Sequence, residues 1–327
     1  MGLMLHCKKL FVVLGLAVMI SGCADTSDNI VENKDATKFR EVIHAMGKTQ
    51  VPENPLRIVV LSVEATETLL ALGIKPIGAV RSQTADSSET WFAHIRDEMT
   101  GTPVVGLENQ VNLEVVASLQ PDLIIGIKAR QEQIYPQLSA VAPTVFTDEF
   151  AGKLRENLML VSEAVNRKDE GQQLLSGLNE QISELSGKLA KKDLLKNEVA
   201  VFRFQVTGAR YYYNTSFAAG LIKDLGFARP ALHDKDDFME TLTMERIPEA
   251  DADIQFYFTF ASADPEQGAE NAQTWLNHPL WQDLRASQKG QVYEVNNDIW
   301  NKSYGILSGR KVLEAIETAL LDQPLEG

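Results

Sequence analysis

Two sets of short apolar segments, each alternating with helical patterns, constrain the fold of this chain most strongly. In the first set, Arg57–Leu61 and Asp122–Gly126 are short runs rich in β-branched residues, which is the pattern of a strand buried on both faces. Residues 62–73, after the first run, have a polar start, apolar residues at helical spacing and a terminal glycine, as in a capped helix. This alternation predicts a parallel sheet with helices on both faces.

The same pattern returns in the second half of the chain. Val199–Phe204 and Ile254–Thr259 read as strands, and Phe217–Leu225 reads as a helix that ends before Gly226. Between the two sets, residues 152–192 contain no proline. Apolar residues recur there at spacings of three and four, which gives a helix one apolar face; they are Leu174, Leu178, Ile182, Leu185 and Leu189.

These patterns predict an α/β fold with two Rossmann-like lobes whose sheets are rich in parallel strands. A long helix at 166–193 would bridge an N-terminal lobe at 48–165 and a C-terminal lobe at 194–327. Small ligands bind preferentially in clefts between such units. We therefore expect a ligand cleft between the lobes.

The N-terminus predicts where the protein works. Lys8 and Lys9 precede an apolar run, Leu10–Ile20, which is followed by Ser21, Gly22 and Cys23. This arrangement is typical of a secretory signal, and the run is shorter than the roughly 20 apolar residues that span a bilayer. The ending resembles the lipobox of bacterial lipoproteins, in which the cysteine is acylated. We predict a signal peptide at 1–22 and a lipidated flexible tether at 23–47; an uncleaved anchor is the alternative.

Composition excludes several classes of function. The formal charge is −14, and −16 once Lys8 and Lys9 are removed with the leader, which disfavours nucleic acid as a partner. Outside the leader the histidines are His44, His94, His233 and His278, and none forms a ligand-like pair, so we expect no metal site made of protein ligands. No Gly-x-Ser-x-Gly, Walker-type or His-Glu-x-x-His motif occurs, so we expect no enzyme and no cofactor.

Basic residues gather at or just beyond the ends of the predicted strands. Arg81 follows one strand, Lys128 and Arg130 follow another, and Arg203 and Arg210 lie in and just beyond the first strand of the second lobe. Open α/β sheets bind ligands outside the carboxyl ends of their strands. Arginine holds carboxylates with two parallel hydrogen bonds, so the two groups would form opposite walls of a cleft for an anionic ligand.

Several separated segments resemble the substrate-binding lipoproteins of ABC importers that take siderophores or cobalamin. These segments are Val51–Leu61, Asn112–Glu114 with Leu119–Ile125, Ser216-Phe217 with Leu225–Phe227, and Met244–Ile247 with Ala252–Ile254. The resemblance runs from about residue 48 to the end, and it is nearest to members that bind citrate-derived or hydroxamate siderophores.

The resemblance implies a function and roles for particular residues. The protein would capture a ferric siderophore outside the cytoplasm, held to the cell membrane only by the lipid on Cys23, and deliver it as a monomer to the permease subunits of an ABC importer. Contacts with the ligand are implied for Arg81, Arg130 and Arg203, and expected for Lys128, Arg210, Trp300 and Tyr304. Glu114 and Glu245 match the acidic residues with which the family docks onto the permease. Haem or cobalamin is the alternative ligand.

Overall fold

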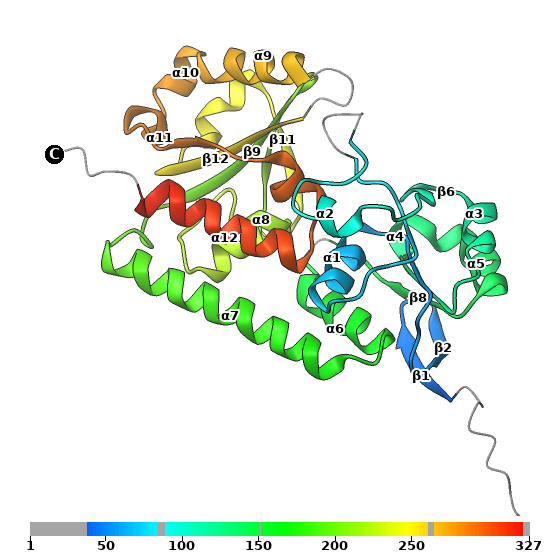
Figure 1. Cartoon of the computed structure of the whole chain (residues 1–327). Helices are drawn as coiled ribbons and strands as arrows, with labels where there is room; N and C mark the ends of the chain where they lie inside the picture. Colours follow the sequence, from blue (N-terminus) through cyan, green and yellow to red (C-terminus); the bar gives the residue numbers. More distant parts are fainter. Residues whose placement is uncertain (1–37, 84–88, 151, 261–264, 323–327) are drawn as a thin grey trace, which may run out of the picture. The chain divides into compact units, whose positions relative to one another are not determined.

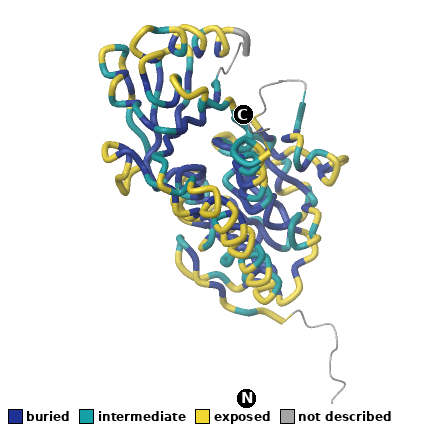
Figure 2. The backbone as a smooth tube through the Cα atoms, turned by 90° about the vertical axis from the view of Figure 1, so that its left-hand side faces the viewer, coloured by how far each residue is buried: buried dark blue, intermediate teal, exposed yellow. Residues whose placement is uncertain are grey.

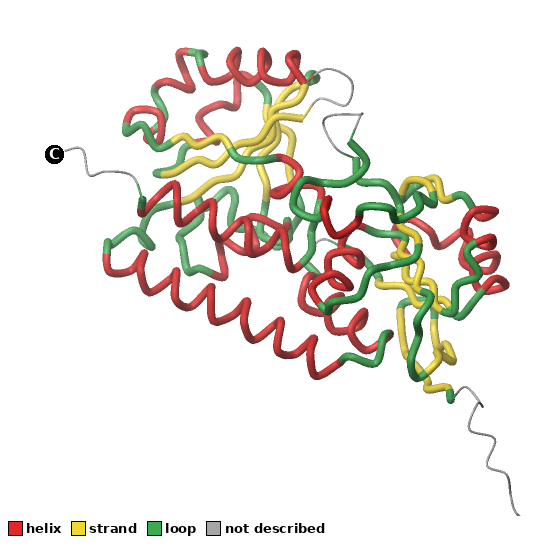
Figure 3. The backbone as a smooth tube through the Cα atoms, in the orientation of Figure 1, coloured by secondary structure: helices red, strands yellow, loops and turns green. Residues whose placement is uncertain are grey.

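The structure is a computed structural model, which describes residues 38–83, 89–150, 152–260 and 265–322 (Figure 1). The described residues all belong to one compact unit. The predicted signal peptide, Cys23 and the tether up to residue 37 lie outside the described residues. None of the helices in the described ranges is long and apolar enough to cross a membrane. The strands form two separate groups (Figure 3), which we call the N-lobe (residues 38–165) and the C-lobe (residues 194–322).

The N-lobe contains a four-stranded parallel sheet with the order β4-β3-β7-β8. Its strands are β3 (Ile58–Val60), β4 (Gly78–Ala79), β7 (Leu123–Ile127) and β8 (Thr144–Thr147). The helical elements between them are α1 (Val63–Ala71), α2 (Arg96–Met99), α3 (Leu113–Ser118), α4 (Lys128–Gln131), η1 (Glu132–Ile134), α5 (Tyr135–Val141) and α6 (Leu154–Ala164). A short hairpin, β5 (Gly106–Leu107) and β6 (Gln110–Val111), lies before α3.

Alternate residues of these strands enter two different cores, as the period of a strand requires. Ile58, Val60 and Ile125 pack with residues of α1 and α6 on one face of the sheet. Val59 and Ile124, their chain neighbours, pack with residues of α3 and α5 on the other face. A sheet covered on both faces must be apolar along its whole strands, which explains why the sequence shows continuous apolar runs. Figure 2 shows these strands as buried and the surrounding helices as partly exposed.

The C-lobe contains a five-stranded sheet with the order β11-β10-β9-β12-β13. Its strands are β9 (Val199–Gln205), β10 (Gly208–Tyr212), β11 (Met239–Leu242), β12 (Ile254–Phe260) and β13 (Val292–Glu294). β9, β12 and β13 are parallel, whereas β10 pairs antiparallel with both β9 and β11. The helical elements are α8 (Phe217–Asp224), η2 (Met244–Ala250), α9 (Pro265–Leu276), α10 (Pro279–Gln282), α11 (Arg285–Gln288), the π-helical turn η3 (Asp298–Lys302) and α12 (Ile306–Leu321).

The C-lobe sheet also has two buried faces. Val199 and Val201 of β9 pack with residues of α7, α8 and α12, while Ala200, Phe202 and Phe204 pack with Trp275 and Trp281 of α9 and α10. Arg203 therefore continues the face of β9 that bears Val199 and Val201. It lies near the carboxyl end of the strand.

The long helix α7 (Lys168–Lys191) connects the lobes and agrees with the helix expected at 166–193. Its buried apolar residues include Leu178, Ile182, Leu185 and Leu189, which are the periodic positions seen in the sequence. In Figure 1 α7 and α12 run side by side, and the two helices are in contact. α12 of the C-lobe also packs against α1 of the N-lobe.

Residues 39–52 form a hairpin, although the sequence assigns residues up to 47 to a tether. Its strands are β1 (Phe39–His44) and β2 (Gly47–Pro52). Val42 and His44 are buried whereas Phe39 and Ile43 are exposed, so β1 has the alternation of a strand with one covered face. The main-chain N–H of Ala45 donates to the carbonyl of Phe146 on β8, at 3.1 Å. The hairpin is therefore joined to the N-lobe.

Candidate functional site

A cavity of about 330 Å³ is lined by residues from both lobes. The N-lobe contributes loops that follow β3, β4, β7 and β8, and the C-lobe contributes β9, β10, β12 and the segment before α12. This agrees with the rule that open α/β sheets bind ligands beyond the carboxyl ends of their strands. The lining consists of Val63, Arg81, Gln83, Phe92, Glu108, Asn109, Arg130, Phe150, Arg203, Tyr212, Phe238, Phe260, Asn301, Lys302 and Tyr304.

Arg81 and Arg130 supply positive charge from the N-lobe. Arg81 follows β4; its main-chain N–H donates to the carbonyl of Gly106 at 2.8 Å, and its guanidinium donates to the carbonyl of Glu89 at 2.9 Å. Arg130 lies in α4, just after β7, with its guanidinium carbon 5.0 Å from the centre of the Phe150 ring. Both arginines are at the strand ends that the sequence indicated.

Arg203 and Lys302 supply positive charge from the C-lobe. The Arg203 guanidinium carbon lies 4.8 Å from the centre of the Phe260 ring, and the Lys302 Nζ lies 5.6 Å from the same centre. Burial lowers the pKa of Arg203, and the neighbouring Arg210 lowers it further. Lys302 also donates to the carbonyl of Gln83 at 2.7 Å. Lys302 thus joins the C-lobe to the loop that carries Arg81.

Tyr304 lines the cavity from a strained backbone position. Its φ is +63°, which is uncommon for a bulky residue and is found mostly where surrounding structure fixes it. The ring stacks on Phe150, with centroids 4.9 Å apart, and meets Phe217 edge-on at 5.8 Å. Burial raises the pKa of the Tyr304 hydroxyl, as do the neighbouring Tyr212 and Glu108. The phenol therefore stays protonated and can donate a hydrogen bond to a ligand.

Three of the expected contact residues lie outside this lining. Lys128 forms an ion pair with Asp148 at 3.9 Å. Arg210 lies on β10 directly opposite Arg203, so it adds positive charge next to Arg203 without lining the cavity itself. Trp300 is 2% exposed and packs on Phe256, with ring centroids 5.0 Å apart. Tyr211, also on β10, is buried.

The two glutamates expected to dock onto a permease lie on the surface, one in each lobe. Glu114 is exposed in the first turn of α3, and Glu245 is exposed in the first turn of η2. The pKa of Glu245 is lowered by hydrogen bonds from its own main-chain N–H and from Thr243. Both side chains are therefore available for a partner.

Sequence patterns did not single out several of the lining residues. Phe150, Phe238 and Phe260 line the cavity, but in the sequence they look like any apolar residue near a strand end. Glu108 lies in the two-residue turn between β5 and β6, where a glutamate is unremarkable. Lys302 lies in η3, the turn before the last helix.

The charges suit a large anion rather than a bare metal ion. Among the described residues the lining has four cationic side chains and one carboxylate. No group of three or more His, Cys, Asp or Glu side chains within the described ranges could hold a metal ion. Aromatic rings beneath the cations provide apolar surface, as in other small-molecule sites.

Comparisons with known proteins show what the chain is similar to. Residues 58–299 match a family described as periplasmic binding protein. The chain is 40% identical over 324 residues to the probable siderophore-binding lipoprotein YfiY of Bacillus subtilis (strain 168), covering 97% of this chain and 98% of the relative. It is 30% identical to the Fe(3+)-citrate-binding protein YfmC of the same organism, covering 91% of each.

A solved structure shares the fold. The crystal structure of Staphylococcus aureus SirA complexed with staphyloferrin B superposes with a TM-score of 0.79 at 30% identity, covering 86% of this chain and 98% of the other. The fold class predicted from the sequence is therefore confirmed.

Proposed function

The chain belongs to the periplasmic binding protein family, and we propose that it captures a ferric siderophore of the citrate or hydroxamate type for an ABC importer. Family membership confirms the resemblance seen in the sequence. The names of two relatives refer to siderophores and to Fe(3+)-citrate, and the SirA structure contains staphyloferrin B. Members of this family bind a ligand rather than convert it.

The observation that carries the proposal is the convergence of Arg81, Arg130, Arg203 and Lys302 on one cavity. These residues come from four different segments of two lobes. The whole chain is strongly acidic, so a local cluster of cations is unlike the rest of the molecule. Cations in a partly buried cavity favour an anionic ligand, because low local polarity strengthens the attraction.

A ferric siderophore fits the chemistry of this cavity. The chelate fills the coordination shell of iron(III), so the protein needs hydrogen-bond donors and positive charge rather than metal ligands. Arginine donates to two oxygens of a carboxylate at once. The volume of about 330 Å³ lies at the lower end of the range for small-molecule sites.

A titration tests the proposal directly. The chain without its first 23 residues would be titrated with ferric citrate, ferric citrate-hydroxamates, ferric trihydroxamates, haem and cobalamin, with tryptophan fluorescence as the signal. Saturable binding of a ferric siderophore below about 1 µM is expected. Binding of haem or cobalamin instead would keep the fold and overturn the ligand.

Single substitutions test the arginine contacts. Arg130→Ala and Arg203→Ala should each weaken binding about tenfold or more, because each removes a charged donor from the cavity. Arg167→Ala is the matched control, since Arg167 is exposed and pairs with Glu170 outside the lining. Wild-type affinity in both cavity variants would contradict the proposed contacts.

The proposal extends to the membrane and the importer. Lipid on Cys23 would hold the protein at the outer face of the cell membrane, with residues up to 37 as a tether. Glu114 and Glu245 would each contact one permease subunit, since each lies exposed on a different lobe. Cys23→Ala should release the protein from the membrane fraction without changing ligand affinity.

A further inference from the structure

Glu108 is the one carboxylate among the described residues that line the cavity. It faces a site otherwise rich in cationic side chains, and attraction of an anionic chelate gives no reason for it. A carboxylate at this place lowers the affinity for any ligand that is uniformly negative. The presence of Glu108 on the lining therefore needs an explanation other than attraction of an anion.

The backbone of the β5–β6 turn is fixed at Glu108. Its carbonyl accepts a hydrogen bond of 2.6 Å from the Gln131 amide, which also donates to the carbonyl of Leu61 at 3.0 Å. The Gln131 side-chain oxygen accepts from the Ile127 N–H at 2.7 Å. Gln131 is 1% exposed, so this buried amide ties the turn to the ends of β3 and β7. The turn is thus a rigid part of the N-lobe.

A glycine is needed for the same hairpin. Gly106 has a φ of +111°, and a Cβ built there would lie 2.4 Å from the carbonyl oxygen of Gln110. A residue with a side chain would break the pairing that places Glu108. The backbone position of Glu108 is therefore fixed by the hairpin.

One carboxylate oxygen of Glu108 is engaged and the other is not. Oε1 accepts a hydrogen bond from the main-chain N–H of Val63 at 2.9 Å. Among the described residues Oε2 has no hydrogen-bond or ion-pair partner. Arg130 is close enough to act on the carboxylate electrostatically, but no ion pair forms between them within the described part of the chain. One acceptor oxygen of this cavity-lining side chain is therefore left for a ligand.

Capping of α1 accounts for only one oxygen of Glu108. Oε1 accepts from the N–H of Val63, the first residue of this helix, while the Ser62 hydroxyl accepts from the N–H of Ala65 at 3.2 Å. Burial raises the pKa of Glu108, and Glu108 in turn helps to raise the pKa of the neighbouring Glu64. Two carboxyl groups near one another are costly, and the capping contact gives no role to the second oxygen of Glu108.

We propose that Glu108 determines specificity by accepting a hydrogen bond from an amide or amine N–H of the ferric chelate. Anionic groups of the ligand would face the arginines, and its N–H group would face the β5–β6 turn. A chelate that presents a carboxylate there is repelled, whereas one with an amide or amine is held. This inference rests on the proposed function and narrows its ligand to siderophores with N–H groups near the anionic groups.

Two chelates and one substitution test the inference. The probes are ferric citrate, which has no N–H, and a ferric citrate-bis(hydroxamate) whose arms join citrate through amide N–H groups. Wild-type protein should bind the amide chelate more tightly. In Glu108→Gln the amide chelate should bind about tenfold more weakly and ferric citrate equally or more tightly, because the negative charge is removed while the shape is kept.

Controls separate the possible outcomes. Asn109→Ala, in the same turn and also on the lining, should change both affinities by a similar factor. If Glu108→Gln unfolds at a lower urea concentration than wild type, the ratio of the affinities for the amide chelate and for ferric citrate is measured again in Glu108→Ala. An unchanged ratio in a folded variant would overturn the role of Glu108 alone. Failure of the wild-type protein to bind either chelate would instead overturn the proposed function.

Discussion

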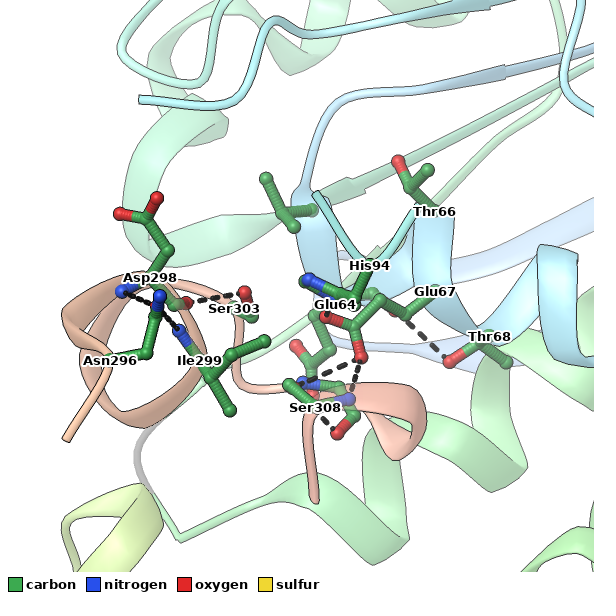
Figure 4. Close-up of polar contacts among 12 residues, drawn as sticks. Glu64, Thr66, Glu67, Thr68, His94, Asn296, Asp298, Ile299, Ser303 and Ser308 are labelled. Carbon is green, nitrogen blue, oxygen red and sulfur yellow. Dashed lines mark hydrogen bonds and ion pairs between the residues drawn. The ribbon is translucent and has the colours of Figure 1, made fainter. Parts of the chain in front are cut away.

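A carboxylate buried between the lobes provides a sharp test of how they are held together. Glu67 of α1 is 0% exposed. Its Oε1 accepts from His94 Nε2 at 2.8 Å, and its Oε2 accepts from the main-chain N–H and the hydroxyl of Ser308, at 2.8 and 3.0 Å (Figure 4). Ser308 lies in the first turn of α12, where N–H groups lack partners within the helix. Glu67 therefore ties α1 of the N-lobe to α12 of the C-lobe.

The cost of removing this carboxylate follows from the groups left behind. Glu67→Ala leaves the His94 Nε2 and the main-chain N–H of Ser308 unpaired in a buried site, while the Ser308 hydroxyl can still donate to the carbonyl of Gly305. Each unsatisfied buried polar group costs about 1–3 kcal/mol. Water entering the new cavity offsets part of this cost. Removing one partner of a buried charged contact commonly costs about 3–5 kcal/mol, so we expect a loss of about 3 kcal/mol. That is a large fraction of the stability of a typical protein.

Urea unfolding followed by circular dichroism measures the loss. For a domain of this size we take a denaturant slope of about 3 kcal/mol per M, so the midpoint of Glu67→Ala should fall by about 1 M. Glu67→Gln keeps one acceptor oxygen, so its urea midpoint should lie between those of wild type and Glu67→Ala. Glu314→Ala is the control, since Glu314 is exposed and pairs with Lys311 on the surface of α12, where such pairs contribute little.

A small loss of stability in Glu67→Ala would refute this explanation. If Glu67→Ala costs less than about 1 kcal/mol, like the Glu314→Ala control, the buried contacts do not join the lobes. A loss confined to the N-lobe, with α12 unaffected in hydrogen exchange, would refute the coupling while keeping the stability effect.

Three further predictions concern uptake, pH and the aromatic lining. Glu114→Ala combined with Glu245→Ala should bind the ferric siderophore normally but fail to support uptake by cells; normal uptake would remove the docking role. Burial raises the pKa of Glu64 in the folded protein well above its ordinary value. The stabilisation that comes with protonating this carboxyl is complete below the pKa of Glu64 in the unfolded chain, and it is lost as pH rises through the pKa in the folded protein. Between these two pKa values Glu64→Gln should therefore become more stable relative to wild type as pH rises, by up to about 1.4 kcal/mol per pH unit. Urea midpoints measured over a range of pH test this, and a constant difference between the midpoints of the two proteins would contradict it. Phe260→Ala should weaken ligand binding about threefold to thirtyfold in a fluorescence titration, because two cations lose contact with an aromatic face worth about 0.5–2 kcal/mol; Phe39→Ala, on an exposed strand outside the cavity, should have no such effect.

Regular elements were predictable because their signals are local. The alternation of apolar runs and helical patterns predicted β3, β7, β9 and β12, and the periodic leucines predicted α7. The β1–β2 hairpin was not predicted, and the assignment of residues 39–47 to a tether was wrong. Phe39 and Ile43 are exposed and only one face of the pair is covered, so the sequence signal is weak. The place of the hairpin is fixed by a contact with Phe146, about a hundred residues away in the sequence.

The cavity was predictable in part. Arg81, Arg130 and Arg203 lie on its lining because strand ends in a parallel sheet meet at one edge, and strand ends can be read from sequence. Lys128 and Arg210 are near those ends too, yet neither is on the lining: Lys128 pairs with Asp148, and Arg210 lies beside Arg203 on the neighbouring strand. Which basic side chain near a strand end reaches the cavity depends on how the strands and helices pack, and the sequence does not fix that packing.

The sequence by itself determined the alternation of elements, the connecting helix, the acidic charge and the arginines at the strand ends, since each depends on neighbours along the chain. Only the tertiary structure decided which side chains meet. Glu108 enters the cavity because Gln131 holds its turn against two strands, and Lys302 reaches Gln83 across more than two hundred residues. Contacts between distant segments depend on how the lobes pack, and no local pattern encodes them.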